Sequence, residues 1–170
     1  MDKITEYLTA YLKPALKIEL KYGVSAIVAL AQSALESGFA ASKPGNMMFG
    51  IKAGSSWTGK KQLLKTTEVL ASPDAKFPEI ISKTLRPDGK YTYIVRDWFR
   101  AYNTPEDSFE DYAKLIVNNA RYKTALSYKS DPFKFIEQIV KGGYATDPDY
   151  LKKMKQLISQ ILEKKKLLPE

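Results

Sequence analysis

Apolar residues recur at helical spacing near the start of the chain. They occupy every third or fourth position, at Ile4, Leu8, Tyr11, Leu12, Ala15, Ile18 and Tyr22. This spacing predicts an amphipathic helix that ends at Gly23, with a kink or break at Pro14. A second helix is predicted to begin after an N-cap at Ser25 and to close at Gly38. Its run from 26 to 35 is almost entirely apolar or small, which is typical of a buried helix.

The middle of the chain changes to patterns that are typical of strands. The stretch KQLLKTTEVL (61–70) is rich in residues that suit an extended chain. The segment from 79 to 102 reads as two strands joined by a turn at Pro87-Asp88-Gly89, a strong hairpin signal. Aromatic residues fall on both faces of the second strand. We therefore expect a small antiparallel sheet with one face covered and the other lining something.

Helical patterns return after residue 103. Three segments begin with a capping residue followed by proline, at Thr104-Pro105, Asp131-Pro132 and Asp147-Pro148. The order of helices, a three-stranded lobe and further helices predicts an α+β fold with a mainly helical core. We expect residues 1–170 to form a single domain, with the β-lobe at about 60–102 inserted between helical segments.

Composition narrows the chemistry that is open to this chain. The 170 residues include neither cysteine nor histidine. This excludes Ser-His-Asp and Cys-His catalysis and zinc sites built from histidine or thiolate ligands. We also expect no metal and no cofactor, because neither of the two mechanisms considered below requires one. Carboxylates, tyrosines, lysines or hydroxyls must do any chemistry. We expect no membrane insertion, because the chain lacks a long apolar run, and its first residues do not resemble a signal peptide.

The formal net charge is +8, from 27 Lys and Arg against 19 Asp and Glu. Such a balance favours an anionic partner, which includes nucleic acid, acidic membrane and acidic wall polymer. Many of the lysines lie in the tail LKKMKQLISQILEKKK (151–166), where a solvated helix face is the ordinary interpretation. No nucleic-acid recognition motif is present, and we expect no nucleic-acid partner.

Glu36 is the first candidate for chemistry, because it is a carboxylate at the end of the apolar second helix. The negative end of the helix dipole and apolar neighbours both disfavour its anion and raise its pKa, as a general acid requires. The ordinary alternative is a glutamate that points into water. Glu68, in the first strand, is a second carboxylate. An acid at a helix end facing another carboxylate across a cleft is the arrangement that glycoside hydrolysis uses.

Two other features support this interpretation. The loop GNMMFGIKAG (45–54) is expected to expose aromatic and backbone groups instead of packing them. The hairpin carries several aromatic side chains, among them Trp98, that suit the faces of sugar rings. Core packing is an equally good interpretation of any single aromatic residue there.

Six segments, in order, resemble the glucosaminidase domain of glycoside hydrolase family 73. They are AQSALESGFA, NMMFGIKA, TTE, FRAY with the following S-x-EDYAKLI, ARY and GYATDPDYLKKM. The resemblance covers about residues 20 to 160. It implies a lysozyme-like α+β fold and hydrolysis of bacterial peptidoglycan. The bond cut would be the β-1,4 bond after N-acetylglucosamine and before N-acetylmuramic acid.

The resemblance also implies roles for single residues. Glu36 matches the general acid of the family, and Glu68 matches its second carboxylate on the β-lobe. Tyr122, in the ARY segment, matches a tyrosine near the reacting acetamido sugar. Substrate-binding positions are implied at Phe49, Gly50 and Tyr144. One departure concerns the residue after Glu68, which is valine here, whereas many members have tyrosine.

The sequence leaves the mechanism and the exact activity open. In one mechanism Glu68 activates a water and the reaction inverts the anomeric centre. In the other the acetamido group of the substrate attacks, positioned by Tyr122 or by Tyr122 and Glu68 together, and the configuration is retained. A lytic transglycosylase or muramidase on the same fold is the nearest rival, and a non-catalytic wall-binding module is another. We expect a monomer that acts on the bacterial cell wall, outside the cell or in the periplasm, or stored in the cytoplasm until phage-type release.

Overall fold

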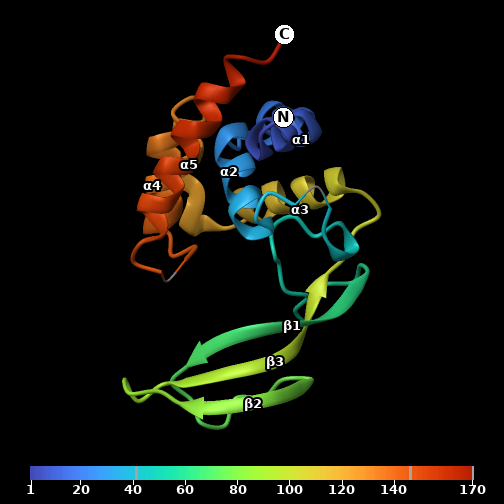
Figure 1. The fold of residues 1–170 in the computed structure, drawn as a ribbon, viewed down its shortest axis with the longest axis vertical. Helices are drawn as coiled ribbons and strands as arrows, with labels where there is room; N and C mark the ends of the chain where they lie inside the picture. Colours follow the sequence, from blue (N-terminus) through green and yellow to red (C-terminus); the bar gives the residue numbers. More distant parts are fainter. Residues whose placement is uncertain (41, 146, 170) are drawn as a thin grey trace. The chain divides into compact units, whose positions relative to one another are not determined.

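The computed structural model describes residues 1–40, 42–145 and 147–169. The chain forms two compact units (Figure 1). One comprises Met1–Phe49 and Asn103–Glu170 and holds the helices, and the other is the β-lobe, Gly50–Tyr102. The lobe therefore begins some ten residues before the boundary predicted at residue 60. The described residues are mainly helical and form one small antiparallel sheet, which confirms the α+β class. The single-domain organisation stays a prediction.

The first two helices begin and end where the sequence predicts. Helix α1 spans Lys3–Tyr22 and helix α2 spans Ala26–Ser37. The hydroxyl of Ser25 accepts a hydrogen bond from the Val28 backbone N–H and caps α2. Gly23 and Gly38 follow the two helices with φ angles of 71° and 61°, where glycine avoids the strain of a side chain. Of the kink or break expected at Pro14, the break is wrong, because α1 continues through this buried proline, and the kink stays a prediction.

The second half of the helical unit contains three α-helices and a 3-10 segment. They are α3 (Pro105–Val117), η2 (Ala120–Tyr128), α4 (Pro132–Lys141) and α5 (Tyr150–Lys165). The predicted caps Thr104 and Asp131 are confirmed, because each side chain accepts a bond from the third backbone N–H beyond it. The cap predicted at Asp147 is wrong. Helix α5 begins later, after Asp149, because the Asp147 carboxylate is bonded to the Asp149 N–H and to the Lys153 ammonium.

Helix α2 lies at the centre of the helical unit. Every residue from Ala26 to Ala34 is buried, as its apolar composition predicts. It packs against α1, α4 and α5, while α3 packs against α1. Among the described residues, no helix has the length and apolar character needed to span a membrane.

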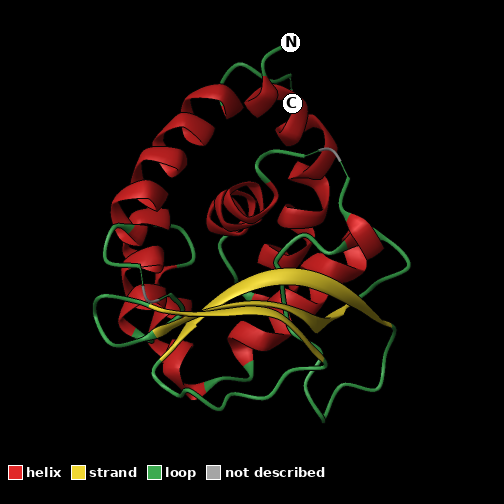
Figure 2. Cartoon of the chain, turned by 60° about the horizontal axis from the view of Figure 1, so that its bottom comes forward, coloured by secondary structure: helices red, strands yellow, loops and turns green. Residues whose placement is uncertain are grey.

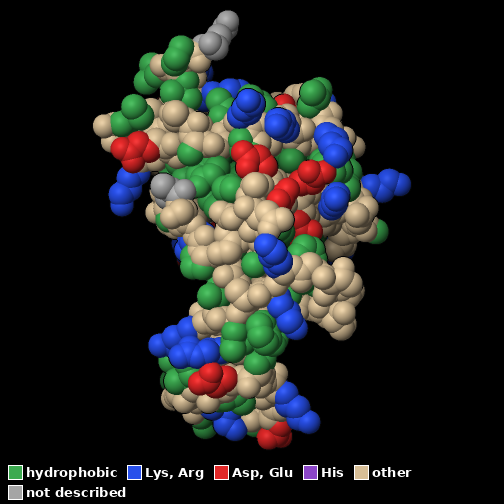
Figure 3. All heavy atoms as spheres, turned by 90° about the vertical axis from the view of Figure 1, so that its right-hand side faces the viewer, with side chains coloured by type: hydrophobic (Ala, Val, Ile, Leu, Met, Phe, Trp, Pro, Cys, Tyr) green, Lys and Arg blue, Asp and Glu red, His purple; other side chains and the backbone are tan. Residues whose placement is uncertain are grey.

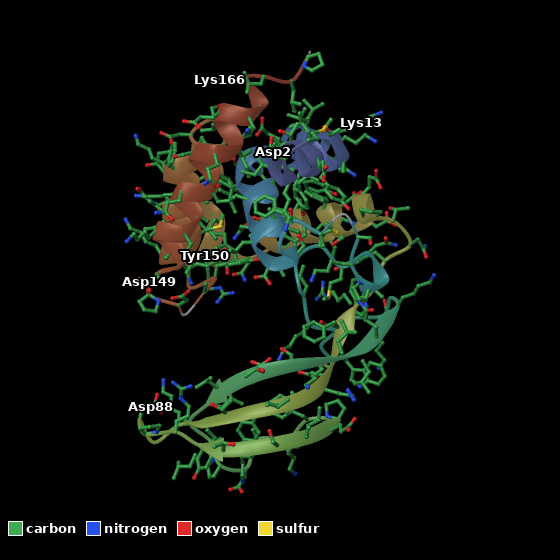
Figure 4. All side chains as sticks on the ribbon, in the orientation of Figure 1. Asp2, Lys13, Asp88, Asp149, Tyr150 and Lys166 are labelled. Carbon is green, nitrogen blue, oxygen red and sulfur yellow. The ribbon has the colours of Figure 1, made fainter. Side chains whose placement is uncertain are left out.

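The β-lobe contains one antiparallel sheet (Figure 2). Its strands are β1 (Lys61–Leu70), β2 (Glu79–Leu85) and β3 (Tyr91–Arg100), in the order β1-β3-β2. The predicted hairpin turn is confirmed between β2 and β3, where Gly89 has a φ of 81° and Asp88 accepts a bond from the Lys90 N–H (Figure 4). These strands position the lobe's carboxylates.

The register of β1 and β3 divides their side chains between two faces. Glu68 pairs with Tyr93 and Leu64 pairs with Asp97, so these four side chains share one face. Leu63 pairs with Trp98 and therefore belongs to the other face. Tyr93 is fully buried, which confirms that one face is covered.

The aromatic core around α3 generates a prediction about stability. Phe109 is fully buried, and its ring meets the Phe49 ring edge to face at a centroid distance of 5.0 Å. Phe109→Ala should lower the free energy of unfolding by about 3–5 kcal/mol, because it leaves a cavity. Urea denaturation followed by circular dichroism measures this. Leu20→Ala is the control, since Leu20 is 88% exposed, and its effect should be close to zero. A small effect of Phe109→Ala would contradict the packing described here.

Candidate active site

Glu36 lies in the last turn of α2, two residues before Gly38 turns the chain away. Its side chain is exposed, yet the surrounding protein removes enough water to raise the pKa of its carboxyl, while the Lys43 ammonium opposes the shift. A carboxyl whose pKa is raised holds its proton to higher pH. The direction is the one that the sequence predicts.

A buried polar network lies one helical turn before Glu36. Gln32 is fully buried and belongs to the same face of α2 as Glu36, four residues on. Its amide N–H donates to the Tyr150 hydroxyl at 3.0 Å, and its carbonyl oxygen accepts from the Tyr112 hydroxyl. Tyr150 begins α5 (Figure 4) and Tyr112 belongs to α3. The amide therefore ties three helices together behind the candidate acid.

Tyr144 and Tyr150 lie within electrostatic range of Glu36. Burial raises the pKa of Tyr150 to about 12 against the bond from Gln32, and the negative charge of Glu36 adds to the increase. Burial also raises the pKa of Tyr144 well above its ordinary value, with further contributions from Tyr150 and Glu36. The two rings are 6.2 Å apart. The predicted acid and the predicted binding residue Tyr144 therefore lie in one cluster.

Tyr122 joins this cluster from η2. It is 1% exposed, its ring centroid lies 6.1 Å from that of Tyr144, and the Arg121 guanidinium lies 5.0 Å from the Tyr122 centroid. A Cβ at Gly142 would lie 2.7 Å from two carbons of the Tyr122 ring. Glycine at 142 is therefore the residue that leaves room for this tyrosine. Tyr122 as a catalytic residue stays a prediction, although the structure places it beside Tyr144.

Phe49 and Gly50 do not form an exposed loop, so that expectation is wrong for Phe49. Phe49 is 3% exposed and stacks on Tyr112 with a centroid distance of 4.1 Å. The Ser108 hydroxyl accepts a bond from the backbone N–H of Met48. Apolar side chains and this backbone bond draw the end of the loop into the core. Gly50 has a φ of 61° and is the first residue of the lobe.

Glu68 is held by an ion pair within the β-lobe. The Lys52 ammonium lies 2.6 Å from a Glu68 carboxylate oxygen and 3.0 Å from an Asp97 carboxylate oxygen. Partial burial by itself lowers the pKa of Lys52, but its bonds to both carboxylates outweigh this and raise it. Lys52 therefore remains a cation that two acids share.

Trp98 lies on the face of the sheet opposite to Glu68. The Lys61 ammonium lies 4.5 Å from the centre of its ring, a cation–π contact. The structure therefore does not bring Trp98 together with Glu68, and a role for Trp98 in substrate binding stays a prediction.

Sequence reasoning missed the residues that support the two carboxylates. Gln32 could have been found, because it interrupts an apolar run one turn before Glu36. Asp97 could also have been found, because it shares the alternating pattern of a covered strand face, where a carboxylate needs a cation. Lys52 gives no such signal, since it pairs with residues far away in sequence. Among the described residues, no three Asp and Glu side chains come together in a way that suits a metal.

Comparisons with known proteins identify the family of the chain. The sequence matches the glucosaminidase family, described as mannosyl-glycoprotein endo-beta-N-acetylglucosaminidase, over residues 12–163. It is 32% identical to the peptidoglycan hydrolase FlgJ of Pseudomonas aeruginosa over 92% of this chain and 36% of that protein. It is also 32% identical to the exo-glucosaminidase LytG of Bacillus subtilis over 85% of this chain and 45% of that protein. The chain thus spans less than half the length of these relatives.

Solved structures agree with the fold. The glycoside hydrolase domain of Salmonella typhimurium FlgJ superposes with a TM-score of 0.71 at 28% identity, covering 94% of this chain and 98% of that domain. The catalytic domain of the Listeria monocytogenes autolysin Auto gives a TM-score of 0.68 at 22% identity, over 97% of this chain and 88% of that domain. The lysozyme-like fold predicted from the sequence is confirmed. The chain belongs to the glucosaminidase family of glycoside hydrolases.

Proposed function

We propose that this chain is an endo-β-N-acetylglucosaminidase that cuts peptidoglycan after N-acetylglucosamine. The observation that carries the proposal is Glu36, a carboxyl with a raised pKa at the exposed end of a buried helix, in a chain of this family. The relatives named peptidoglycan hydrolases support the choice of substrate. One relative, LytG, is named an exo-glucosaminidase, so the names of the relatives do not decide between endo and exo cleavage. Endo cleavage is therefore our own proposal for this chain.

In the proposed reaction Glu36 acts as the general acid. Its carboxyl donates a proton to the glycosidic oxygen as the bond to the anomeric carbon breaks, so the leaving sugar departs as a neutral alcohol. Desolvation keeps the proton on Glu36 to a higher pH than an ordinary glutamate would hold it. Gln32 and its two tyrosines hold the end of α2 in place while this happens.

The acetamido group of the substrate completes the reaction on the other side of the anomeric carbon. Its carbonyl oxygen bonds to that carbon as the bond to the leaving sugar breaks. Water then attacks the same carbon, breaks the new bond and gives up a proton to the Glu36 carboxylate, so the configuration is retained and the acid is restored. Tyr122 orients this group. In this route Glu68 has only a positioning role. Its ion pair with Lys52 supports this role, because one of its carboxylate oxygens is already bonded to a cation.

The charge of the chain suits the proposed place of action. Lys and Arg side chains are spread over the face drawn in Figure 3, and the net charge is +8. Anionic wall polymers attract such a surface. We propose that the chain acts on the bacterial cell wall as a monomer.

Mass spectrometry of digested peptidoglycan tests the function. The proposal predicts new reducing ends on N-acetylglucosamine. Reducing ends on muramic acid would instead identify a muramidase, and an anhydro sugar would identify a lytic transglycosylase. Binding to sacculi without any new ends would identify a non-catalytic module. If the digest released only single sugars from the ends of the glycan strands, the enzyme would be an exo-glucosaminidase and not an endo-glucosaminidase.

Glu36→Gln should lower turnover by about 10²–10⁴-fold, because glutamine cannot donate the proton. The same change should raise the thermal unfolding midpoint at pH 7, where folding desolvates an ionised Glu36, and should not raise it at pH 3, where the carboxyl is protonated in both states. Glu163→Gln, at an exposed glutamate near the end of α5, is the control and should do neither. A folded Glu36→Gln variant with more than about a tenth of normal turnover would refute the assignment.

Tyr122→Phe and Glu68→Gln distinguish the two mechanisms. With the acetamido route, Tyr122→Phe should lower kcat on the order of 10²-fold with little change in KM, because the hydroxyl acts in the transition state. Glu68→Gln should cost on the order of tenfold, less than Glu36→Gln. Tyr128→Phe, in the same 3-10 segment, is the control. The inverting route predicts the reverse: an inactive Glu68→Gln enzyme that azide rescues, beside a normal Tyr122→Phe enzyme.

A further inference from the structure

Lys52 lies on the same face of the sheet as Glu68. Its backbone forms an antiparallel bridge with Phe99, and Phe99 pairs with Gln62 on the face that carries Glu68. The residues around it are fixed to β3, since the Ala53 N–H donates to the Trp98 carbonyl and the Arg100 N–H donates to the Ile51 carbonyl. The lysine therefore starts from an anchored backbone.

The two carboxylates that Lys52 binds are far apart along the sheet. Asp97 pairs with Leu64, four residues before Glu68 on β1, which is a separation of about 13 Å along the strand. Two side chains at this separation on one strand face are too far apart to contact each other without a third group between them. The lysine ammonium, at 2.6 and 3.0 Å from them, draws the Glu68 side chain along the sheet toward the end of the lobe where the chain enters and leaves it.

Asp97 is itself held in place. One of its carboxylate oxygens accepts a bond from the Trp98 backbone N–H at 2.8 Å, and the other bonds to Lys52. The Phe77 ring lies beneath the lysine, with its centre 5.8 Å from the ammonium. Asp97 and Phe77 thus fix the ammonium from two sides, and the ammonium fixes Glu68.

We propose that Lys52 is a positioning residue: it ties Glu68 to Asp97 and thereby sets where the Glu68 carboxylate lies while the glycan is cut. This inference rests on the proposed function. A flexible glutamate would sample several rotamers, whereas a glutamate bonded to an anchored lysine keeps one. Lys52 does not need to touch the substrate.

The test is a double-mutant cycle in turnover of soluble peptidoglycan glycan strands. Lys52→Met should lower kcat on the order of tenfold and no further than Glu68→Gln does, with little change in KM, because a misplaced group near the reacting atoms costs up to about a hundredfold. Lys52→Met should have no additional effect in the Glu68→Gln background. Lys52→Arg, which keeps the cation, should retain most of the activity.

Two controls separate positioning from general structure. Lys65→Met removes an exposed lysine from the opposite face of β1 and should leave kcat unchanged. The same cycle measured by thermal unfolding at pH 7 should show a coupling between Lys52→Met and Glu68→Gln whether or not the enzyme is active.

The outcomes distinguish failure of the proposed function from failure of this inference. An inactive wild-type protein would refute the proposed function and this inference with it. An active protein in which Lys52→Met lowers kcat equally with and without Glu68, or in which Lys52→Arg is as impaired as Lys52→Met, would refute the inference alone. Absence of coupling in thermal unfolding would also refute it.

Discussion

The burial of α2 is the constraint on which the candidate site depends. A helix whose residues from Ala26 to Ala34 have almost no contact with water can present a reactive group only at its end. Gln32, the largest polar side chain inside this stretch, is accommodated because two tyrosine hydroxyls bond to the two ends of its amide. The same bonds hold α3 and α5 against the turn that carries Glu36. Burial of the helix and placement of the acid therefore have one cause.

Most of the fold can be predicted from the sequence, because local signals specify it. Glycines at 23 and 38 and the cap residues Ser25 and Thr104 end or begin helices through bonds to near neighbours. Predictions failed where a distant partner decides. Pro14 stays inside α1 because a long helix tolerates one missing bond when packing holds both halves. Phe49 is buried because Phe109 and Tyr112 stack against it from another helix.

In the candidate site, too, local sequence predicts some residues and distant partners decide the rest. Glu36 stands out in the sequence, since a carboxylate that follows an apolar run is unusual, and the family motif supports the same residue. Its neighbours Tyr144 and Tyr150 reach it from the far end of the chain, which no local pattern reveals. The same is true of Glu68. Its strand was predicted from the sequence, but its partner Lys52 lies before that strand and contacts the Glu68 carboxylate across the face of the sheet. In both units a predictable carboxylate has neighbours that only the fold brings to it.

The central claim is that the end of α2 makes Glu36 hold its proton more tightly than an ordinary glutamate. Carbon-13 NMR of the glutamate carboxyl groups, titrated with pH and assigned to Glu36 by comparison with Glu36→Gln, measures this directly. We expect a pKa for Glu36 above the ordinary value of a glutamate, because desolvation by the surrounding protein outweighs the opposing charge of Lys43. A Glu36 pKa at or below the ordinary value would refute its assignment as the general acid, since the end of α2 would then not favour the protonated carboxyl.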